Sequence, residues 1–380
     1  MSGPCSAKPL RRANHELAEL GNLWHSIQAW LFPVLEDELG ELDDRHREFV
    51  VVCEICKPRK HVAAYRWVGN GCSPKDRLAL CKAFIAKAVW DFPTTSALID
   101  AVRHRPTLRR LCGWETLAEI PGESTFSRAF AAFAKDELPQ SIHQAMLRER
   151  YGDKIAGHIS RDATAIHARE KAAKKEPKPL RQAQGQAVPH AEGEDPVSPE
   201  PTRLQRQLER TMEENLADLP RGCDWGTKKD SKGKKESWRG YKLHLDTIDG
   251  AVPISWLVTS ASMHDSQAAI PLAQMSAGRV TSLYDLADAA YDAKEIRQMS
   301  ERLGHVALID HNPRRGEKRE FSPAEAIRYR QRSSAERVNS HLHDNHGGRH
   351  IRVRGAAKVA AHLSFGLLVI AAEQLLTMVC

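Results

Sequence analysis

The stretch that decides the fold runs from residue 241 to residue 259 and reads YKLHLDTIDGAVPISWLVT. Its two halves, YKLHLD at 241–246 and ISWLVT at 254–259, are rich in the β-branched, aromatic and leucine side chains that are typical of strands. Between them, Asp249-Gly250 supplies the residue pair that a tight turn favours. The stretch therefore predicts a β-hairpin.

Further strands are expected on both sides of this hairpin, at 158–166 (HISRDATAI), 283–287 and 306–310 (VALID). Helices are expected from about residue 293 and over 324–343. Three strands thus come first, and helices and strands then alternate. This order predicts an α/β architecture in which a mixed sheet is flanked by helices.

Upstream of the strands, residues 14–152 show helical periodicity, as in DRLALCKAFIAKAVW at 76–90. Helix starts are expected at Ser73-Pro74 and at Ser124, which would act as a cap. We therefore expect a helical N-terminal domain over 1–152 and an α/β domain over 153–380. Within the latter, residues 172–221 are poor in large apolar side chains and predict a flexible insertion, partly helical at 203–215, for which the sequence indicates no role.

The composition favours a polyanionic partner inside the cell. Lys and Arg number 56 against 49 Asp and Glu, a formal charge of +7. Basic residues cluster at 57–59, 103–110, 171–178, 228–235 and 314–319, where they could neutralise phosphates, although each cluster also fits a solvated surface. Eight cysteines without a charged-then-apolar leader indicate a reducing, cytoplasmic location with free thiols. The most apolar stretch, 363–372, is roughly half as long as a membrane span, so no membrane role is expected. No Gly-x-Ser-x-Gly, Gly-x4-Gly-Lys or dinucleotide-binding motif is present.

Three acidic residues suggest a metal centre. Asp162 lies in the middle of an expected strand, where a carboxylate is costly unless it binds something, and Asp288 follows the end of another. Glu336 lies on the expected helix four residues after Arg332, which is close enough to orient it. Two strands and a helix would thus present three oxygen ligands, which suit a pair of hard divalent cations in phosphodiester chemistry. Spacing alone leaves open that each Asp is an N-cap or an ion-pair partner.

The helix that carries Glu336 places four polar residues on one face. Tyr329, Arg332, Glu336 and His343 fall within a sector of roughly 60°. The first three match the signature Tyr-x2-Arg-x3-Glu-x6-Lys in register, and here the sequence resembles the bacterial insertion-sequence DDE transposases. His343 replaces the final Lys and would contact a DNA phosphate only when protonated.

Further blocks in the same order strengthen this resemblance. Asp162-Ala163-Thr164 is similar to the block of the first family acid, and ADAAYD at 287–292 is similar to that of the second, with Ala290 where Gly is common. The other similar blocks are GYKLH at 240–244, His264-Asp265-Ser266 and the N-terminal stretch 108–128.

The resemblance implies an RNase H-like fold and a DNA transposase. Asp162, Asp288 and Glu336 would hold Mg²⁺ or Mn²⁺, with two ions expected, and Tyr329 and Arg332 would position Glu336 or DNA. The enzyme would nick the ends of an insertion sequence, and the freed 3′-hydroxyl would then attack target DNA without a covalent protein intermediate. Terminal inverted repeats and target DNA are the expected partners, N-terminal helices would read the ends, and a homodimer on nucleoid DNA would hold both ends.

Two other functions remain open on sequence. A decayed or repurposed transposase would only bind DNA, as the departures at Ala290 and His343 suggest. An RNase H-like nuclease without strand transfer would use the same three acids.

The sequence also suggests a DNA contact and a zinc site. Trp238 and Lys242 would bind DNA by base stacking and phosphate contact, or Trp238 would belong to the sheet core. Cys53 and Cys56, with His61 nearby, have a spacing that can chelate zinc, although Cys81 lies on an apolar helix where a free thiol is ordinary.

Overall fold

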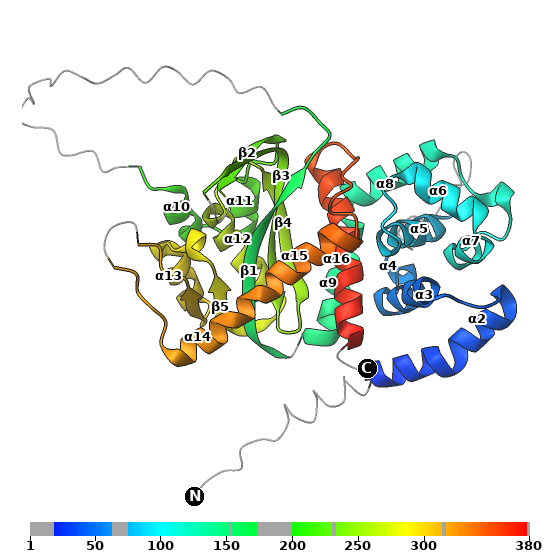
Figure 1. The fold of residues 1–380 in the computed structure, drawn as a ribbon, viewed down its shortest axis with the longest axis horizontal. Coiled ribbons are helices and arrows are strands. Elements are labelled where there is room, and N and C mark those ends of the chain that lie inside the picture. Colours follow the sequence, from blue (N-terminus) through cyan, green and yellow to red (C-terminus); the bar gives the residue numbers. More distant parts are fainter. Residues whose placement is uncertain are drawn as a thin grey trace, which may run out of the picture.

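The computed structural model describes residues 19–62, 75–152, 154–172, 200–229, 233–313 and 317–377. Expectations that fall on residues 73–74, 173–199 and 314–316 lie outside these ranges. Figure 1 shows a helical part, formed by the first half of the chain, beside a sheet with helices on both faces. The helices of the first part are η1 (Ile27–Leu31), α2 (Phe32–Leu39), α3 (Asp44–Cys56), α4 (Arg59–Val62), α5 (Arg77–Val89), α6 (Thr95–His104), α7 (Pro106–Cys112), η3 (Leu117–Glu119), α8 (Glu123–Lys135) and α9 (Leu138–Tyr151).

Side-chain caps begin several of these helices. Asp76 starts α5 by accepting hydrogen bonds from the amides of Leu78 and Ala79, and Thr94 starts α6 in the same way. The expectation that Ser124 caps a helix is wrong. Helix α8 begins one residue earlier, at Glu123, so Ser124 already lies inside its first turn and Gly122 is the N-cap.

The sheet has the mixed topology expected of an RNase H-like fold. Its strands are β1 (Ile155–His167), β2 (Asp224–Lys229), β3 (Lys235–Ile248), β4 (Val252–Ser260), β5 (Thr281–Ala287) and β6 (Val306–Ile309). Strand β1 lies between β3, which is antiparallel to it, and β5, which is parallel, and β6 follows β5 in parallel. Strand β4 pairs with the second half of β3 and β2 with the first half.

The expected β3–β4 hairpin is present, and its turn is tied to β1. Gly250 adopts φ +78° and Ala251 φ +59°, the left-handed region that such turns need. The carboxylate of Asp249 accepts hydrogen bonds from the amides of Gly157 and His158 and contacts the His158 ring at 2.8 Å. The turn residue thereby fixes the start of the central strand.

Helices cover both faces of the sheet (Figure 1). In the part of the expected insertion that is described, two short helices, α10 and α11, pack against α12. The bounds are α10 (Arg203–Glu209), α11 (Met212–Ala217), α12 (Ser266–Ala277), η4 (Ala289–Tyr291), α13 (Lys294–Arg302), α14 (Pro323–Tyr329), η5 (Arg330–Arg332), α15 (Ser333–Asn345) and α16 (Ala356–Thr377).

The single helix expected over 324–343 is broken. A 3₁₀ turn, η5, separates α14 from α15, and the Ser333 hydroxyl donates to the Arg330 carbonyl there. Serine hydroxyls that bond to the backbone in this way compete with regular helical hydrogen bonds. The break places Arg332 at the junction from which α15 starts.

Helix α16 belongs to two hydrophobic cores. One set of its side chains packs with the N-terminal helices, namely Ala361, Phe365, Leu368, Ala372 and Leu375. The other set packs with the sheet, namely Val359, Leu363, Leu367 and Ile370. Figure 1 shows this helix between the two parts of the molecule. In the described chain it is also the one helix long and apolar enough to cross a membrane, but 72% of its apolar window is buried, as in a core helix of a soluble protein.

Candidate active site

The first acid, Asp162, lies in the middle of β1 on the face that α15 covers. Its Oδ2 accepts a hydrogen bond of 3.0 Å from Asn339 Nδ2 of α15. Burial raises the pKa of Asp162 to about 6, and the nearby charge of Asp288 adds to this effect. A carboxylate in this position is costly for folding.

The second acid, Asp288, comes directly after β5. It caps the short helix η4, because its Oδ1 accepts from the Ala290 amide at 2.9 Å. Burial raises its pKa, and the neighbouring carboxylates of Asp265 and Asp310 act in the same direction. The N-cap alternative is therefore correct for one oxygen of Asp288, yet the side chain also belongs to an acidic cluster.

The third acid, Glu336, lies in the first turn of α15 and is half-exposed. Arg332 Nη2 donates to Glu336 Oε1 at 2.6 Å, and the guanidinium lies 5.8 Å from the centre of the Tyr329 ring. The side chains of Tyr329, Arg332 and Glu336 thus lie together, as their spacing in the sequence predicts. The charge of Arg332 also opposes the rise in pKa at Asp162 and Asp288, so this one cation lies close to all three acids.

The oxygen atoms around Asp162 and Asp288 suit a hard divalent cation. Two carboxylates whose charged forms are disfavoured gain most from a neighbouring positive ion. Among the side chains that the structure describes, Asn339 Oδ1 is a buried oxygen without a hydrogen-bond partner, adjacent to Asp162. The three acids lie too far apart for one shared ion in this conformation, because the only group in the described chain with three ligand atoms within 4.8 Å is formed elsewhere.

Helix α15 and the η5 turn before it lie along β1. Ser160 Oγ donates to the Gln331 carbonyl at 3.0 Å, and Thr164 Oγ1 lies 3.1 Å from His343 Nε2. Between them is the contact of Asp162 with Asn339. Four helical residues rise about 6 Å and two strand residues about 6.6 Å, so Asn339 and His343 meet alternate residues of β1. Asn339 was missed by the sequence reasoning, although it follows Glu336 by one helical turn.

His343 reaches the same face, but it is not a ready cation. Burial lowers its pKa, and the charge of Arg349 lowers it further, so the ring is neutral at neutral pH. The expected phosphate contact by a protonated His343 therefore requires a rearrangement or an acidic medium.

The expected base-stacking role of Trp238 does not fit its position. The ring is 3% exposed and its indole N–H donates to the Tyr241 carbonyl, so the alternative of sheet packing is correct for this conformation. Lys242 lies above that ring and pairs with Asp265 at 2.7 Å. Since Asp265 acts on Asp288, Lys242 is coupled to the acids through this ion pair.

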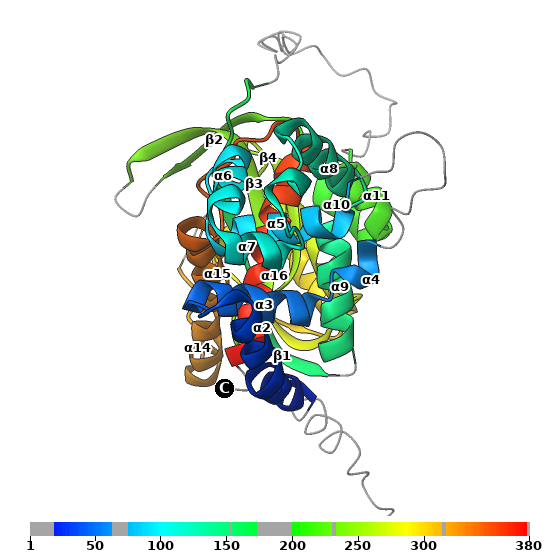
Figure 2. The same cartoon turned by 90° about the vertical axis from the view of Figure 1, so that its right-hand side faces the viewer.

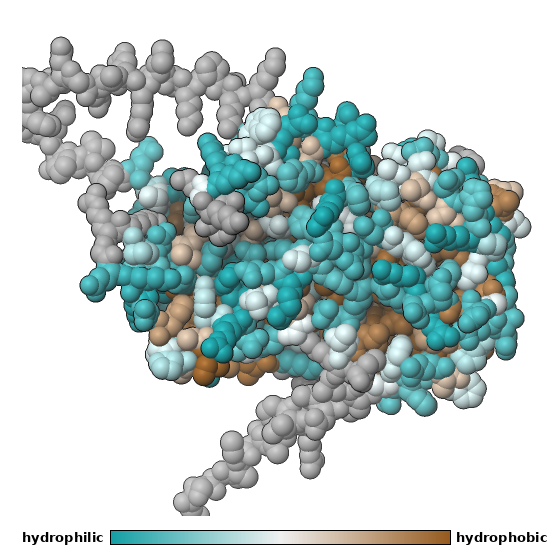
Figure 3. Space-filling model, viewed as in Figure 1, coloured by the Kyte–Doolittle hydropathy of each residue, from teal (hydrophilic) through white to brown (hydrophobic). Residues whose placement is uncertain are grey.

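A more exposed candidate for contact with nucleic acid was missed. Strand β2 and the first half of β3 form a ribbon that projects from the sheet (Figure 2), and Trp225 on it is 56% exposed. Lys228 on the same ribbon acts on the pKa of His343, which places the ribbon beside α15. The basic cluster at 228–235 was the available signal. The surface over α15 is mostly hydrophilic (Figure 3).

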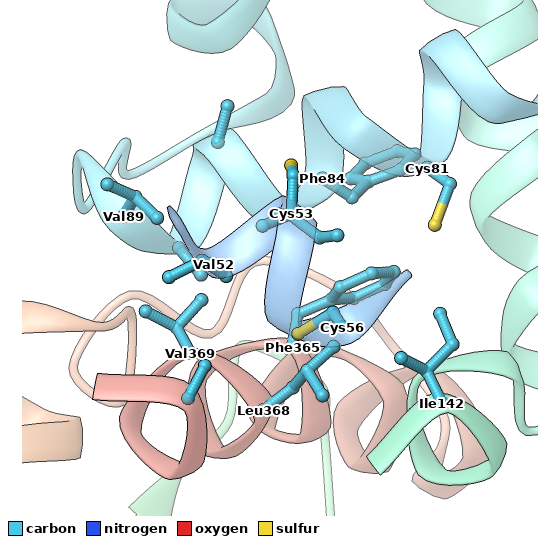
Figure 4. Packing of buried hydrophobic residues seen from close by; sticks show 14 of the residues in the cluster. Val52, Cys53, Cys56, Cys81, Phe84, Val89, Ile142, Phe365, Leu368 and Val369 are labelled. Carbon is cyan, nitrogen blue, oxygen red and sulfur yellow. The ribbon is translucent and has the colours of Figure 1, made fainter. Parts of the chain in front are cut away.

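The cysteine pair does not form a zinc site. Cys53 and Cys56 lie on α3 inside the apolar core, among Phe84, Phe365 and Leu368 (Figure 4). Burial raises the pKa of Cys53 to about 12 and that of Cys56 far above its usual range, which disfavours the thiolate that zinc requires.

Comparison with known protein families gives two matches. Residues 161–371, more than half of the chain, match a family described as Transposase DDE domain. Residues 39–132 match a family described as Transposase domain (DUF772). No curated protein and no solved structure gave a match.

Proposed function

The chain belongs to the DDE transposases, and from that premise we propose that Asp162, Asp288 and Glu336 form its catalytic centre. The protein is an enzyme of DNA cleavage and strand transfer, the general activity of this family, which generally uses divalent metal ions. The finer assignment is that the three acids hold two Mg²⁺ or Mn²⁺ ions. Bound ions would stabilise charge on the attacking and leaving oxygens of the phosphodiester.

One observation carries this assignment. Asp162 is a buried carboxylate in the middle of the central strand, it faces a second acid at the end of the neighbouring strand, and burial raises its pKa to about 6. Groups with such perturbed pKa values concentrate at functional sites, because folding alone does not favour them. Arg332 and the hydrogen bonds to these acids offset part of this cost, and a bound cation would offset the rest.

We assign Arg332 a positioning role that changes during the reaction. Its guanidinium donates to Glu336 at 2.6 Å and acts electrostatically on the other two acids. Bound cations would take over this neutralising role. Glu336 would then serve as an oxygen ligand, and Arg332 would be free to bind a DNA phosphate through two parallel hydrogen bonds.

DNA is the macromolecular partner. We propose that the terminal inverted repeats and the target DNA lie over α15 and the ribbon of β2 and β3, with the helical region of residues 1–152 reading the element ends. A homodimer would hold the two ends together, since a two-ended reaction is easiest for a symmetric pair. Such a protein acts in the cytoplasm on nucleoid DNA.

The test is cleavage of a labelled duplex that carries the inverted repeats flanking the native gene, with Mg²⁺ and with EDTA. The wild-type protein should leave 3′-hydroxyl ends at the repeat boundary only with metal, and Asp288→Ala should bind the duplex without cutting it. Full cleavage by Asp288→Ala would refute the assignment.

A matched pair of variants on one helix controls for surface charge. Glu336 and Asp344 both lie on α15, each carboxylate is 50% exposed, and each pairs with an arginine. Glu336→Gln should lose cleavage, whereas Asp344→Asn should keep it. Equal losses in both would mean that the charge of the helix, not the ligand, matters.

The same assay separates the other two functions. Specific binding of repeat ends without metal-dependent cutting by the wild-type protein would identify a repurposed DNA-binding protein. Cleavage without any joined product on a target plasmid would identify a nuclease.

A further inference from the structure

A second polar cluster lies between the C-terminal half of α15 and helix α16. His341 Nε2 lies 3.0 Å from Glu373 Oε2 of α16, and His346 Nε2 lies 2.9 Å from His341 Nε2 and 3.4 Å from the same carboxylate oxygen. In the described chain this is the one group in which three ligand atoms lie within 4.8 Å of one another.

The orientation of His346 shows which of its atoms faces the cluster as an acceptor. Its Nδ1 lies 3.1 Å from the Ala88 carbonyl at the end of α5. A carbonyl only accepts, so Nδ1 carries the hydrogen and a neutral ring presents a lone pair at Nε2. Metal-binding histidines are oriented by this type of backbone contact.

A second carboxylate, Glu48 of α3, approaches Glu373 from the N-terminal helices. The two carboxyl groups are within hydrogen-bond distance of each other, and Arg45 Nη1 donates to both oxygens of Glu48, at 2.9 and 3.3 Å. Two imidazole nitrogens and the Glu373 carboxylate thus face one point, and the Glu48 carboxyl group lies beside Glu373. These acceptors repel one another unless protons or a metal ion lie between them.

We propose that His341, His346 and Glu373 form a structural zinc site, with Glu48 as the fourth ligand. Zinc takes nitrogen and oxygen ligands in a tetrahedron at about 2.0–2.2 Å, which puts neighbouring ligand atoms about 3.3 Å apart. The three distances of 2.9–3.4 Å fit this spacing. Imidazole ligands favour zinc over Mg²⁺, so this site and the catalytic acids select different ions.

The position of the site gives it a mechanical role. Its ligands come from α3, α15 and α16, and the Ala88 carbonyl comes from the end of α5. Zinc there fastens the end of α15 to the N-terminal helices, while the start of the same helix carries Glu336. Loss of the ion would therefore loosen the helix that presents a catalytic acid to the sheet.

The experiment uses full-length protein without an affinity tag, stripped with a chelator and then titrated with zinc alone. We expect a single zinc ion per chain by elemental analysis, a higher melting temperature with zinc, and the visible absorption bands of tetrahedral cobalt when Co²⁺ replaces it. Absence of stoichiometric zinc and of the cobalt bands in the wild-type protein would overturn the proposal.

Variants locate the ion. His341 is partly exposed, so His341→Ala should fold and should lose both the zinc and the cobalt bands. His104→Ala, at an exposed histidine that contacts only the Asp100 carbonyl among the described hydrogen bonds, should keep them. Asp162→Asn should also keep them, because the catalytic acids are a separate site. Retention of zinc by His341→Ala would refute the site, and unchanged affinity in Glu48→Gln would refute Glu48 as a ligand.

Discussion

Arg161 and Asp162 are adjacent on β1 but point to opposite faces of the sheet, and the two faces treat charge differently. Under α12, Arg161 binds Asp246 through two hydrogen bonds of 2.8 and 2.7 Å, and Ser276 donates to the same carboxylate. Under α15, Asp162 faces another acid and receives hydrogen bonds only from neutral amides, those of Asn339 and the Ala163 backbone. On the α12 face, opposite charges bind β1 to β3. On the α15 face, the negative charges lack an equal positive charge, which favours the binding of a cationic ligand.

The electrostatic contrast follows from the partners. Despite burial, the neighbouring Asp246 raises the pKa of Arg161, and Arg161 in turn opposes the rise that burial causes in the pKa of Asp246, so each charge stabilises the other. Asp162 lacks such a partner at bonding distance in the described structure, and burial raises its pKa instead. A partly buried charge without an opposite charge at bonding distance therefore marks function on one face, while a fully buried charge with such a partner marks structure on the other.

The largest effect is expected for Asp162→Asn, which removes the charge on the α15 face. Cleavage should fall by at least about three orders of magnitude, since a bound metal contributes several kcal/mol of transition-state stabilisation. Folding should be unharmed, because the variant removes an unfavourable buried charge. Initial rates of strand nicking and urea unfolding measure the two effects, and a marked loss of stability would contradict the comparison.

The opposite result is expected for Asp246→Ala on the other face. Removing one partner of a buried ion pair leaves Arg161 unpaired and should cost about 3–5 kcal/mol of unfolding free energy. Urea unfolding of the variant and the wild-type protein measures this loss of free energy. A cost similar to that of an exposed pair, below about 1 kcal/mol, would show that Arg161 finds water or another partner.

The stability of the metal-free protein should depend on pH through Asp162. Its pKa rises from 3.8 in the unfolded chain to about 6 in the folded protein. The folded state therefore binds the proton more tightly, and this contribution is complete below the unfolded pKa and lost as pH rises through about 6. The loss is up to about 3 kcal/mol. Asp162→Asn removes it, so the stability difference between the two proteins should grow between about pH 4 and pH 7 in EDTA.

A smaller effect on cleavage is expected for Asn339→Leu. The variant keeps the volume but removes the donor that orients Asp162, and losing such a contact behind a metal ligand typically costs about 10–100-fold. Ser340→Ala, at the exposed neighbour on the same helix, is the control. Equal activity of the two variants would remove Asn339 from the site.

The smallest change is expected for His343→Lys. His343 is neutral because burial lowers its pKa, whereas lysine adds one charge near the ribbon of β2 and β3. The slope of log affinity for duplex DNA against log salt should steepen by about 0.9. An unchanged slope would place this position away from the phosphates.

Much of the sheet was predictable because hydrophobic alternation and turn residues are local. The Asp249-Gly250 turn, the strands on either side and the relation of Arg332 to Glu336 depend on neighbours within a few residues. The resemblance to DDE transposases supplied Asp162 and Asp288 as partners. Spacing alone left them open, because their proximity arises from β1–β5 pairing across more than a hundred residues.

Other features depend on contacts that no local pattern contains. The sequence around Trp238 predicts a base-stacking residue, but the side chain is buried and only 3% exposed. Cys53 and Cys56 have chelating spacing, yet α3 turns both into an apolar core. Conversely, His341, His346 and Glu373 have no motif spacing and meet only because α15 and α16 pack together.

The double use of α16 has a consequence for biosynthesis. The helices of residues 19–151 leave the ribosome before α16, but their core includes Phe365, Leu368 and Leu375 of that helix. Early-made segments generally fold as they emerge, whereas here the apolar surface of the earlier segment stays open until α16 has been made. A premature stop before residue 356 would thus produce an aggregation-prone fragment, not a free DNA-binding domain, and a shortened copy of the gene would make a poor competitor of the intact enzyme.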